Sequence, residues 1–196
     1  MFALRPYQTA WYRPFFSLER RLTEAQVRRL VKLGEAQPRE EATVARASGT
    51  VVDAEFRNAR LAWLHPDPST QKCFELLRNL VEEVNEAAYG FDLIGFAEPL
   101  QYTVYEAPSV GYDWHIDMID SPDSVQRKLS ITIQLSGPRE YAGGDLELRE
   151  GTVALTAPRA RGAVVAFPSW QPHRVTPVTR GTRRSLVAWV GGPRFR

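Results

Sequence analysis

Three side chains in this sequence have the types and spacing of metal ligands. His115 and Asp117 lie two positions apart in the stretch GYDWHID, which reads as a β-strand. Side chains at positions i and i+2 of a strand leave the same face, so the imidazole and the carboxylate would point the same way. A second histidine, His173, begins a later strand-like run directly after a proline-containing turn. Taken alone, the His-x-Asp pair could equally be an ordinary surface pair.

Together, two imidazoles and one carboxylate form the ligand set that leaves open coordination positions on non-haem Fe(II). The mixed nitrogen and oxygen donors suit a divalent metal, and the absence of thiolates disfavours a closed structural zinc site. A catalytic zinc, as in a hydrolase, stays chemically possible with the same three residues. The remaining histidine, His65 in WLHPDP, has no such setting and is expected to be a loop residue.

A strand-like run near the C-terminus, RRSLVAWV at 183–190, raises the question of a buried cation. Its odd positions, beginning with Arg183, alternate with even positions beginning with Arg184, and one face must point into the protein. A guanidinium on that face is costly unless it pairs with an anion. No acidic residue lies beside it in the sequence, so a bound dicarboxylate is an attractive partner. The alternation leaves open which of the two arginines points inward.

These residues lie in the part of the chain where the hydrophobic period is two. Short strand-like runs separated by Gly, Pro, Ser and Asp predict an antiparallel sandwich or barrel. In the run 127–136 the usual interpretation places the apolar positions inward and the polar positions outward. A barrel whose interior binds a polar ligand would instead turn Thr132 and Gln134 inward. The predicted strands span 98–105, 111–117, 127–136, 144–149, 162–167, 173–178 and 183–190.

Before residue 95 the pattern is helical. Thr23 and Gln26 form a capping box in front of an amphipathic stretch. A second helix is expected to open near Asp67-Pro68 and to stop at Gly90. Between the two helices, residues 37–58 are polar and weakly periodic, and connections of this length are often either functional lids or disordered.

The sequence therefore predicts a mainly β fold in which N-terminal helices buttress one side of a β core. We expect residues 1–196 to form a single domain, with a helical buttress and substrate-side loop in 1–95 and the β core in 96–192.

The composition is that of an ordinary globular protein, with 24% charged and 43% hydrophobic residues. The net charge of +2 is too small to indicate a nucleic-acid partner. The single cysteine, Cys73, excludes an intramolecular disulfide and is expected to be a buried small hydrophobe. The N-terminal residues lack a signal-peptide core, and no segment approaches the roughly 20 apolar residues of a membrane span. A cytoplasmic protein without a membrane partner is expected.

The motifs in the second half resemble those of the Fe(II)/2-oxoglutarate-dependent oxygenases. Within these, the chain is most similar to the prolyl 4-hydroxylase-like group, which includes the bacterial PKHD-type hydroxylases. The resemblance covers residues 96–192. It rests on the order and spacing of Tyr105, His115, Asp117, His173, Arg183 and Trp189, with the motifs GGDL, FPSWQPH, HRVTPV and RGTR.

This resemblance implies a double-stranded β-helix, or jelly-roll, whose open end holds Fe(II). His115, Asp117 and His173 would be the iron ligands, and the carboxylate ligand favours hydroxylation over halogenation. Dioxygen and 2-oxoglutarate would be cosubstrates and succinate and carbon dioxide the co-products, with ascorbate as a candidate reductant.

The same resemblance implies a pocket for 2-oxoglutarate. Arg183 would pair with its distal carboxylate, and Tyr105 would hydrogen-bond that carboxylate. Thr132 and Gln134 would line the pocket, which turns the polar face of 127–136 inward.

The substrate is expected to enter over the metal, beside residues 37–64 and 106–124. Group analogy favours a prolyl or other side chain in a protein or peptide. A free amino acid or small metabolite is the alternative substrate, and a non-catalytic sensor of metal and 2-oxoglutarate is the alternative function. The oligomeric state is left open. The candidate substrate-facing residues are Arg57, Arg60, Tyr112 and Trp114.

Overall fold

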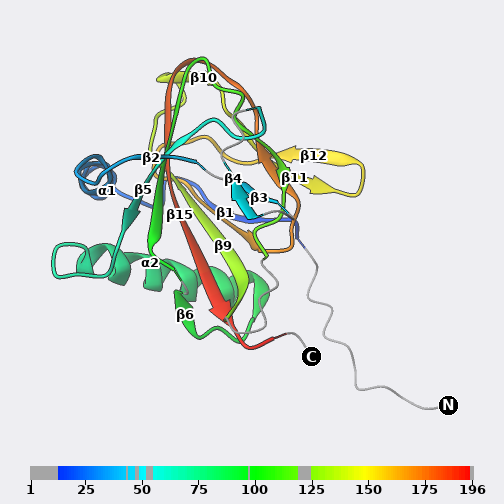
Figure 1. Cartoon of the computed structure of the whole chain (residues 1–196). Coiled ribbons are helices and arrows are strands. Elements are labelled where there is room, and N and C mark those ends of the chain that lie inside the picture. The colour runs from blue at the N-terminus through cyan, green and yellow to red at the C-terminus, as the bar shows by residue number, and fades with distance from the viewer. Residues whose placement is uncertain are drawn as a thin grey trace.

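The computed structural model describes residues 13–42, 44–46, 49–51, 55–96, 98–118 and 125–194. Within these ranges, a nine-stranded antiparallel sheet forms the centre of the fold, in the order β1-β13-β9-β15-β7-β5-β2, with β10 and β6 also paired to β15 (Figure 1). Its strands are β1 (Phe16–Leu18), β2 (Glu40–Glu41), β5 (Arg60–Leu64), β6 (Gly95–Phe96), β7 (Leu100–Glu106), β9 (Gln126–Gln134), β10 (Tyr141–Gly143), β13 (Val164–Pro168) and β15 (Val178–Gly192).

A smaller sheet of four strands lies against one face of this major sheet (Figure 1). Its order is β12-β11-β14-β8, so strands that are distant in sequence become neighbours in space. A separate pair, β3 with β4, lies within the long polar connection 37–58. The bounds are β12 (Val153–Thr156), β11 (Leu146–Glu150), β14 (His173–Val175), β8 (Tyr112–His115), β3 (Val44–Arg46) and β4 (Gly49–Val51).

The two predicted helices are present as α1 (Glu24–Glu35) and α2 (Gln71–Val84). The capping box before α1 is confirmed, because the Thr23 side chain accepts from the Gln26 N–H and the Gln26 side chain accepts from the Thr23 N–H. The second helix begins later than Asp67, because that side chain accepts from two following backbone N–H groups and closes a turn. A π-helical turn at Asn85–Tyr89 then leads to Gly90, which is left-handed with φ of 62°.

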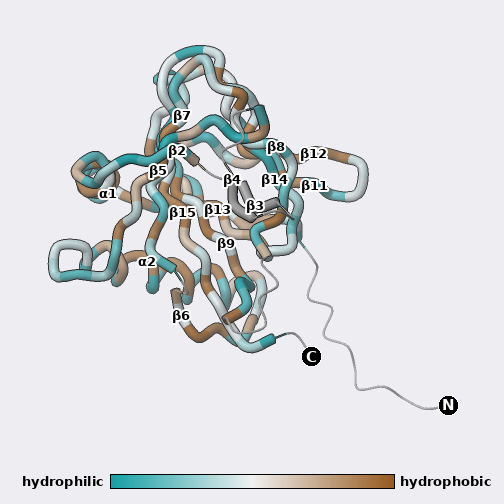
Figure 2. Tube along the Cα trace, in the orientation of Figure 1, coloured by the Kyte–Doolittle hydropathy of each residue, from teal (hydrophilic) through white to brown (hydrophobic). Residues whose placement is uncertain are grey.

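Both faces of the major sheet are buried, which decides the orientation of the run 127–136. On β9, Leu129, Ile131 and Ile133 are fully buried in the cluster that contains the helix residues. The polar positions of the same strand are also buried and face the smaller sheet. The usual polar-outward interpretation is therefore wrong for this strand, since helices cover one face and a second sheet covers the other. Figure 2 shows the apolar residues concentrated where α2 meets the major sheet.

The jelly-roll prediction is confirmed in outline, and the strand bounds differ in detail. The sequence predicts two strands at 173–178 and 183–190. In the structure the first strand, β14, ends at Val175, and the second, β15, begins at Val178 and runs without interruption to Gly192. Residues 60–64 are not among the predicted strands, yet they form β5, which joins the major sheet. Its residues Leu61, Ala62 and Leu64 are all buried, so both faces are covered and no period of two marks the strand.

Three strands from before residue 95 (β1, β2 and β5) thus belong to the major sheet, and the segment expected as a helical buttress also extends the β core. The connection 37–58, for which a lid and disorder were both left open, lies partly outside the described residues, as do positions 119–124 of the expected substrate side. Over the described ranges, no helix combines the length and the apolar character needed to cross a membrane.

Candidate active site

The three predicted metal ligands converge at the end of the smaller sheet. Strands β8 and β14 pair so that His173 lies directly opposite His115. Asp117 lies just beyond the end of β8. One ligand atom from each of the three residues lies within 4.8 Å of the others. The nearest carboxylate oxygens are 3.9 Å from the His115 Nε2 and 3.5 Å from the His173 Nε2.

Asp117 reaches this point by a different route from the one predicted. The strand ends at His115, so the two-residue alternation of a strand does not set the direction of the carboxylate. Instead, the backbone N–H groups of Asp117 and Met118 both donate to the Ser169 carbonyl, at 2.9 and 2.8 Å. The Arg127 guanidinium donates to the Asp117 carbonyl at 3.1 Å. The loop before His173 thereby holds the carboxylate against the two imidazoles.

Both imidazoles are oriented for coordination through Nε2. The Nδ1 of His115 lies 2.7 Å from the Asp113 carbonyl, and the Nδ1 of His173 lies 3.0 Å from the Gln171 carbonyl. A carbonyl oxygen only accepts, so each Nδ1 carries the proton and each Nε2 keeps a free lone pair. The chemistry and spacing of the donors therefore fit a single divalent cation.

The ionisation states also suit metal binding. Burial lowers the pKa of His115 from 6.5 to about 3, and the neighbouring His173 adds to the shift. Burial alone would raise the pKa of Asp117, but the two imidazoles and a hydrogen bond from Ser130 hold it below its usual value. That hydrogen bond runs from the Ser130 hydroxyl to Asp117 Oδ2 at 2.7 Å. At neutral pH His115 is thus neutral and Asp117 is charged, which are the forms that bind a metal.

A cavity of about 320 Å³ opens beside the three ligands, between the two sheets. Arg183 lines it and is 2% exposed. Over the described ranges its side chain has one hydrogen bond, a 3.3 Å contact to Ser185, and its Nε is buried without a partner. Among the described residues, no carboxylate lies within ion-pairing distance of this guanidinium. A buried cation in this state calls for an anionic ligand.

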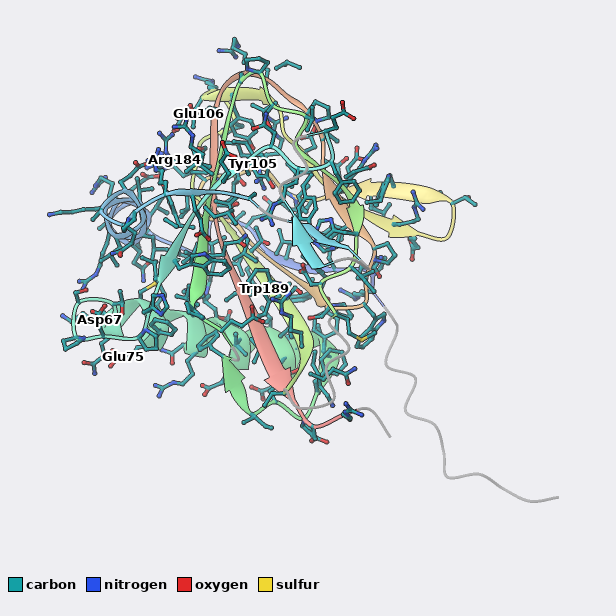
Figure 3. All side chains as sticks on the ribbon, in the orientation of Figure 1. Asp67, Glu75, Tyr105, Glu106, Arg184 and Trp189 are labelled. Carbon is teal, nitrogen blue, oxygen red and sulfur yellow. The ribbon has the colours of Figure 1, made fainter. Side chains whose placement is uncertain are left out.

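The structure of the major sheet decides which of the two arginines, Arg183 or Arg184, points into the protein. The odd positions of β15 (Arg183, Ser185, Val187 and Trp189) all line the cavity. Arg184 points to the other face, where its Nε donates to Glu35 of α1 at 3.0 Å. Figure 3 shows Arg184 on the side of α1, with Tyr105 and Trp189 at different heights along the sheet.

The residues predicted for the cosubstrate lie around Arg183. Tyr105 is its direct neighbour across β7 and β15, and it is 2% exposed. Thr132 lines the main cavity, and it borders a small recess next to Arg183 together with Gln134. The Gln134 side-chain amide donates to the hydroxyl of Tyr141 at 2.7 Å. Tyr141 borders the same recess and was missed at the sequence level, where it stands in a turn-rich stretch without a strand signal.

The four candidate substrate residues separate into two pairs. Arg57 and Tyr112 line the cavity. Arg60 is on the opposite face of β5 and lies 3.7 Å from Glu106. The guanidinium groups of two arginines, Arg149 and Arg174, lie over the Trp114 ring at 4.2 and 4.8 Å. Neither Arg60 nor Trp114 is among the cavity-lining residues, and the substrate role of all four stays a prediction.

Other cavity residues were not found from the sequence. Leu61 and Trp63 of β5 face the cavity, next to the predicted Arg60. Trp63 lies 6.4 Å from Trp189, and the Arg127 guanidinium stacks over Trp189 at 3.9 Å. Ser130, which donates to Asp117 but is not among the cavity-lining residues, shares the inward face of β9 with Thr132 and Gln134, so the alternation of that strand could have identified it.

Comparisons with known proteins agree with this geometry. The family model described as "2OG-Fe(II) oxygenase superfamily" matches residues 100–191. A PKHD-type hydroxylase from Sphingopyxis alaskensis is 31% identical over 155 residues, which is 74% of this chain and 69% of that protein. A PKHD-type hydroxylase from a Synechococcus strain is 40% identical over 91 residues, which is 44% of this chain and 39% of that protein. This second match therefore spans less than half the length of the relative.

Solved structures show the same fold at low sequence identity. A prolyl-4-hydroxylase from Pseudomonas putida superimposes with a TM-score of 0.73 at 19% identity, covering 95% of this chain and 96% of that chain. A prolyl hydroxylase from Trichoplax adhaerens, solved with a peptide fragment of the hypoxia inducible factor oxygen degradation domain, gives a TM-score of 0.72 at 16% identity. It covers 91% of this chain and 83% of that chain.

Proposed function

The chain belongs to the 2OG-Fe(II) oxygenase superfamily as a PKHD-type member, and from this premise we propose that it is an Fe(II)- and 2-oxoglutarate-dependent dioxygenase. Its reaction would be the hydroxylation of an unactivated C–H bond in a prolyl or other amino-acid side chain of a protein or peptide. One observation carries the proposal. A buried arginine that has no carboxylate partner in the part of the chain that the structure describes, Arg183, shares a single cavity with two histidines and an aspartate that fit a divalent cation.

In this proposal His115, Asp117 and His173 hold Fe(II). When bound, the metal with 2-oxoglutarate and dioxygen supplies the oxidant for the C–H bond, with succinate and carbon dioxide as co-products. The protein contributes the orientation of the ligands. The two backbone carbonyls fix the tautomer of the imidazoles, and Ser130 fixes the carboxylate rotamer.

The cosubstrate would be held by charge and hydrogen bonds at the Arg183 end of the cavity. A guanidinium binds a carboxylate through two parallel N–H bonds, and such charge-assisted bonds are roughly twice as strong as neutral ones. Tyr105, the cross-strand neighbour of Arg183, would donate to the same carboxylate. Thr132 and the Gln134–Tyr141 pair would bound the far end of the pocket.

The substrate side of the cavity is mainly apolar, which suits an aliphatic target. Trp63, Trp189 and Leu61 line it, and Ile116, which lies between the two ligands of the His-x-Asp pair, also lines it while being 46% exposed. The peptide bound by the Trichoplax structural neighbour supports a peptidyl substrate by analogy. Ascorbate is proposed as a reductant that keeps the iron in its Fe(II) form.

The test is succinate formation from 2-oxoglutarate by purified protein with Fe(II) under oxygen. We expect Asp117→Ala and His173→Ala to abolish it, and His65→Ala, which changes the one histidine outside the site, to leave it intact. Mass spectrometry of peptide and amino-acid pools would then identify a product heavier by one oxygen atom. Turnover that is equal in the Asp117→Ala variant would refute the assignment. Ligand binding without turnover would indicate a sensor, and an oxygen-independent activity retained with zinc would indicate a hydrolase.

A further inference from the structure

A stacked column of three side chains ends on one of the metal ligands. The Tyr112 ring lies 3.5 Å from the His115 imidazole, with 18° between their planes. The Arg57 guanidinium carbon lies 4.4 Å from the centre of the same Tyr112 ring. Because the imidazole fills one face of the phenol ring at van der Waals distance, the guanidinium takes the other face. Phe56 closes the edge of the ring at 5.7 Å, nearly perpendicular to it.

The backbone holds this column in place from both ends. Arg57 and Tyr112 form an antiparallel bridge, which joins the end of the long connection to β8. The Asp113 N–H donates to the Phe56 carbonyl at 3.0 Å, and the Asn58 N–H donates to the Gly111 carbonyl at 3.1 Å. Arg57 is 9% exposed. Backbone hydrogen bonds therefore join the two segments that carry the stacked side chains, and the arginine of the stack is buried.

We propose that Tyr112 and Arg57 are positioning residues that set the plane of the His115 imidazole, although both also line the cavity where a substrate would lie. This inference rests on the proposed metal-dependent function. His115 lies opposite His173 with ring centres 4.1 Å apart, and its Nδ1 is tied to the Asp113 carbonyl. The hydrogen bond to Asp113 fixes the Nδ1 edge of the His115 ring, and His173 packs against one side of that ring. The stack with Tyr112 fixes the remaining rotation, so the Nε2 lone pair stays directed at the metal position.

The physical basis is the face-to-face contact itself. Residues that orient a metal-binding histidine typically affect metal affinity by 10- to 100-fold, on the order measured for outer-shell substitutions. A guanidinium over the outer face of the phenol ring adds a cation–π attraction that holds the ring flat. The Tyr112 hydroxyl has no hydrogen bond among the described residues, so the aromatic face is the part of the side chain that acts.

The experiment measures Co(II) binding to the purified chain by the visible absorption of the bound ion, together with the thermal midpoint of the metal-free protein. We expect Tyr112→Leu to weaken Co(II) binding by about 10-fold or more and to alter the absorption envelope. Tyr112→Phe, which keeps the ring, should bind within about twofold of the parent. Arg57→Met should lose about 3- to 10-fold, as expected from removing one cation–π contact.

Trp114→Leu is the matched control. Trp114 lies on the same strand and also packs against guanidinium groups, but its ring is outside the cavity lining. We expect this variant to bind Co(II) like the parent. If Tyr112→Leu binds Co(II) like the parent, or if Trp114→Leu weakens binding equally, the positioning role is refuted. Should Tyr112→Leu not fold, Arg57→Met decides, and unchanged Co(II) affinity in that variant refutes the role.

These readouts separate this inference from the proposed function. Loss of Co(II) binding in Tyr112→Leu, in a parent that binds Co(II) but never forms succinate, would support the positioning role while the dioxygenase proposal fails. Normal Co(II) binding in Tyr112→Leu, together with loss of succinate formation from 2-oxoglutarate, would make Tyr112 a contact of the reactants and refute the positioning role.

Discussion

Replacing Arg183 with methionine should stabilise the metal-free protein while removing its response to 2-oxoglutarate. Arg183 is 2% exposed, and its Nε is buried without a partner. Burial of an uncompensated cation is costly, and exchanging buried charges for apolar side chains of similar volume commonly raises stability by about 1–4 kcal/mol. Taking about 2 kcal/mol, the thermal midpoint of a domain of this size should rise by about 4–8 °C.

The ligand response should change in the opposite direction. In the parent with Mn(II), which replaces Fe(II) without turnover, 2-oxoglutarate at 100 times its Kd should add about 2.7 kcal/mol of stability. Removing a bidentate, charge-assisted pair costs about 3 kcal/mol or more, which weakens the Kd by at least about 100-fold. At the same ligand concentration the variant should then gain only about 0.4 kcal/mol.

Differential scanning fluorimetry with and without 2-oxoglutarate measures both effects in one experiment. Arg184→Met is the matched control, because the neighbouring arginine is on the other face of β15 and pairs with Glu35. It should lose up to about 1 kcal/mol of stability and keep the full response to 2-oxoglutarate. An Arg183→Met variant that melts lower than the parent, and that still responds to 2-oxoglutarate, would show that Arg183 has a structural partner and does not bind the ligand.

Three further outcomes are expected. Ser130→Ala removes the 2.7 Å hydrogen bond to the buried Asp117 carboxylate and should weaken Co(II) binding by about 10-fold in a titration, while the metal-free protein loses about 1–3 kcal/mol of stability. Burial raises the pKa of Cys73 from 9.0 to about 12, so the folded protein at pH 8 should not react with a thiol reagent until it unfolds. The contribution of the neutral thiol to stability should be complete below pH 9 and should decline as the pH rises towards 12. Gly111 has φ of 81°, and a Cβ at this position would lie 2.2 Å from a backbone oxygen of β14, so Gly111→Ala should lower the free energy of unfolding by about 3 kcal/mol or more in denaturant. Gly151 has φ of 59° but open space around it, so Gly151→Ala should cost only about 1 kcal/mol. Equal losses in the two variants would contradict the steric argument.

Local signals were sufficient where the interacting residues are close in the chain. The capping box of α1 joins positions three residues apart, and its geometry follows from the residue types alone. The apolar positions of β9 face the helix-side core as their alternation indicates, because a period of two is a property of the strand itself. The types and order of the candidate ligands and of Arg183 could likewise be read without coordinates.

Local signals failed where burial on both sides removes the pattern. Strand β5 has no alternation because both of its faces are covered, so Leu61 and Trp63 could not be identified as cavity residues. The polar face of β9 was ambiguous for a related reason. Whether Thr132 and Gln134 face solvent or a cavity depends on the smaller sheet, which forms from strands elsewhere in the chain.

By itself, then, the sequence determined which chemical groups this protein possesses and the order in which they occur. Only the tertiary structure decided how they meet. The pairing of β8 with β14 sets His173 opposite His115, and backbone bonds to Ser169 turn Asp117 towards both rings. The major sheet directs Arg183 into the cavity and Arg184 towards α1. Each of these arrangements depends on contacts between residues far apart in the chain, and a local sequence pattern does not predict the energies of such contacts.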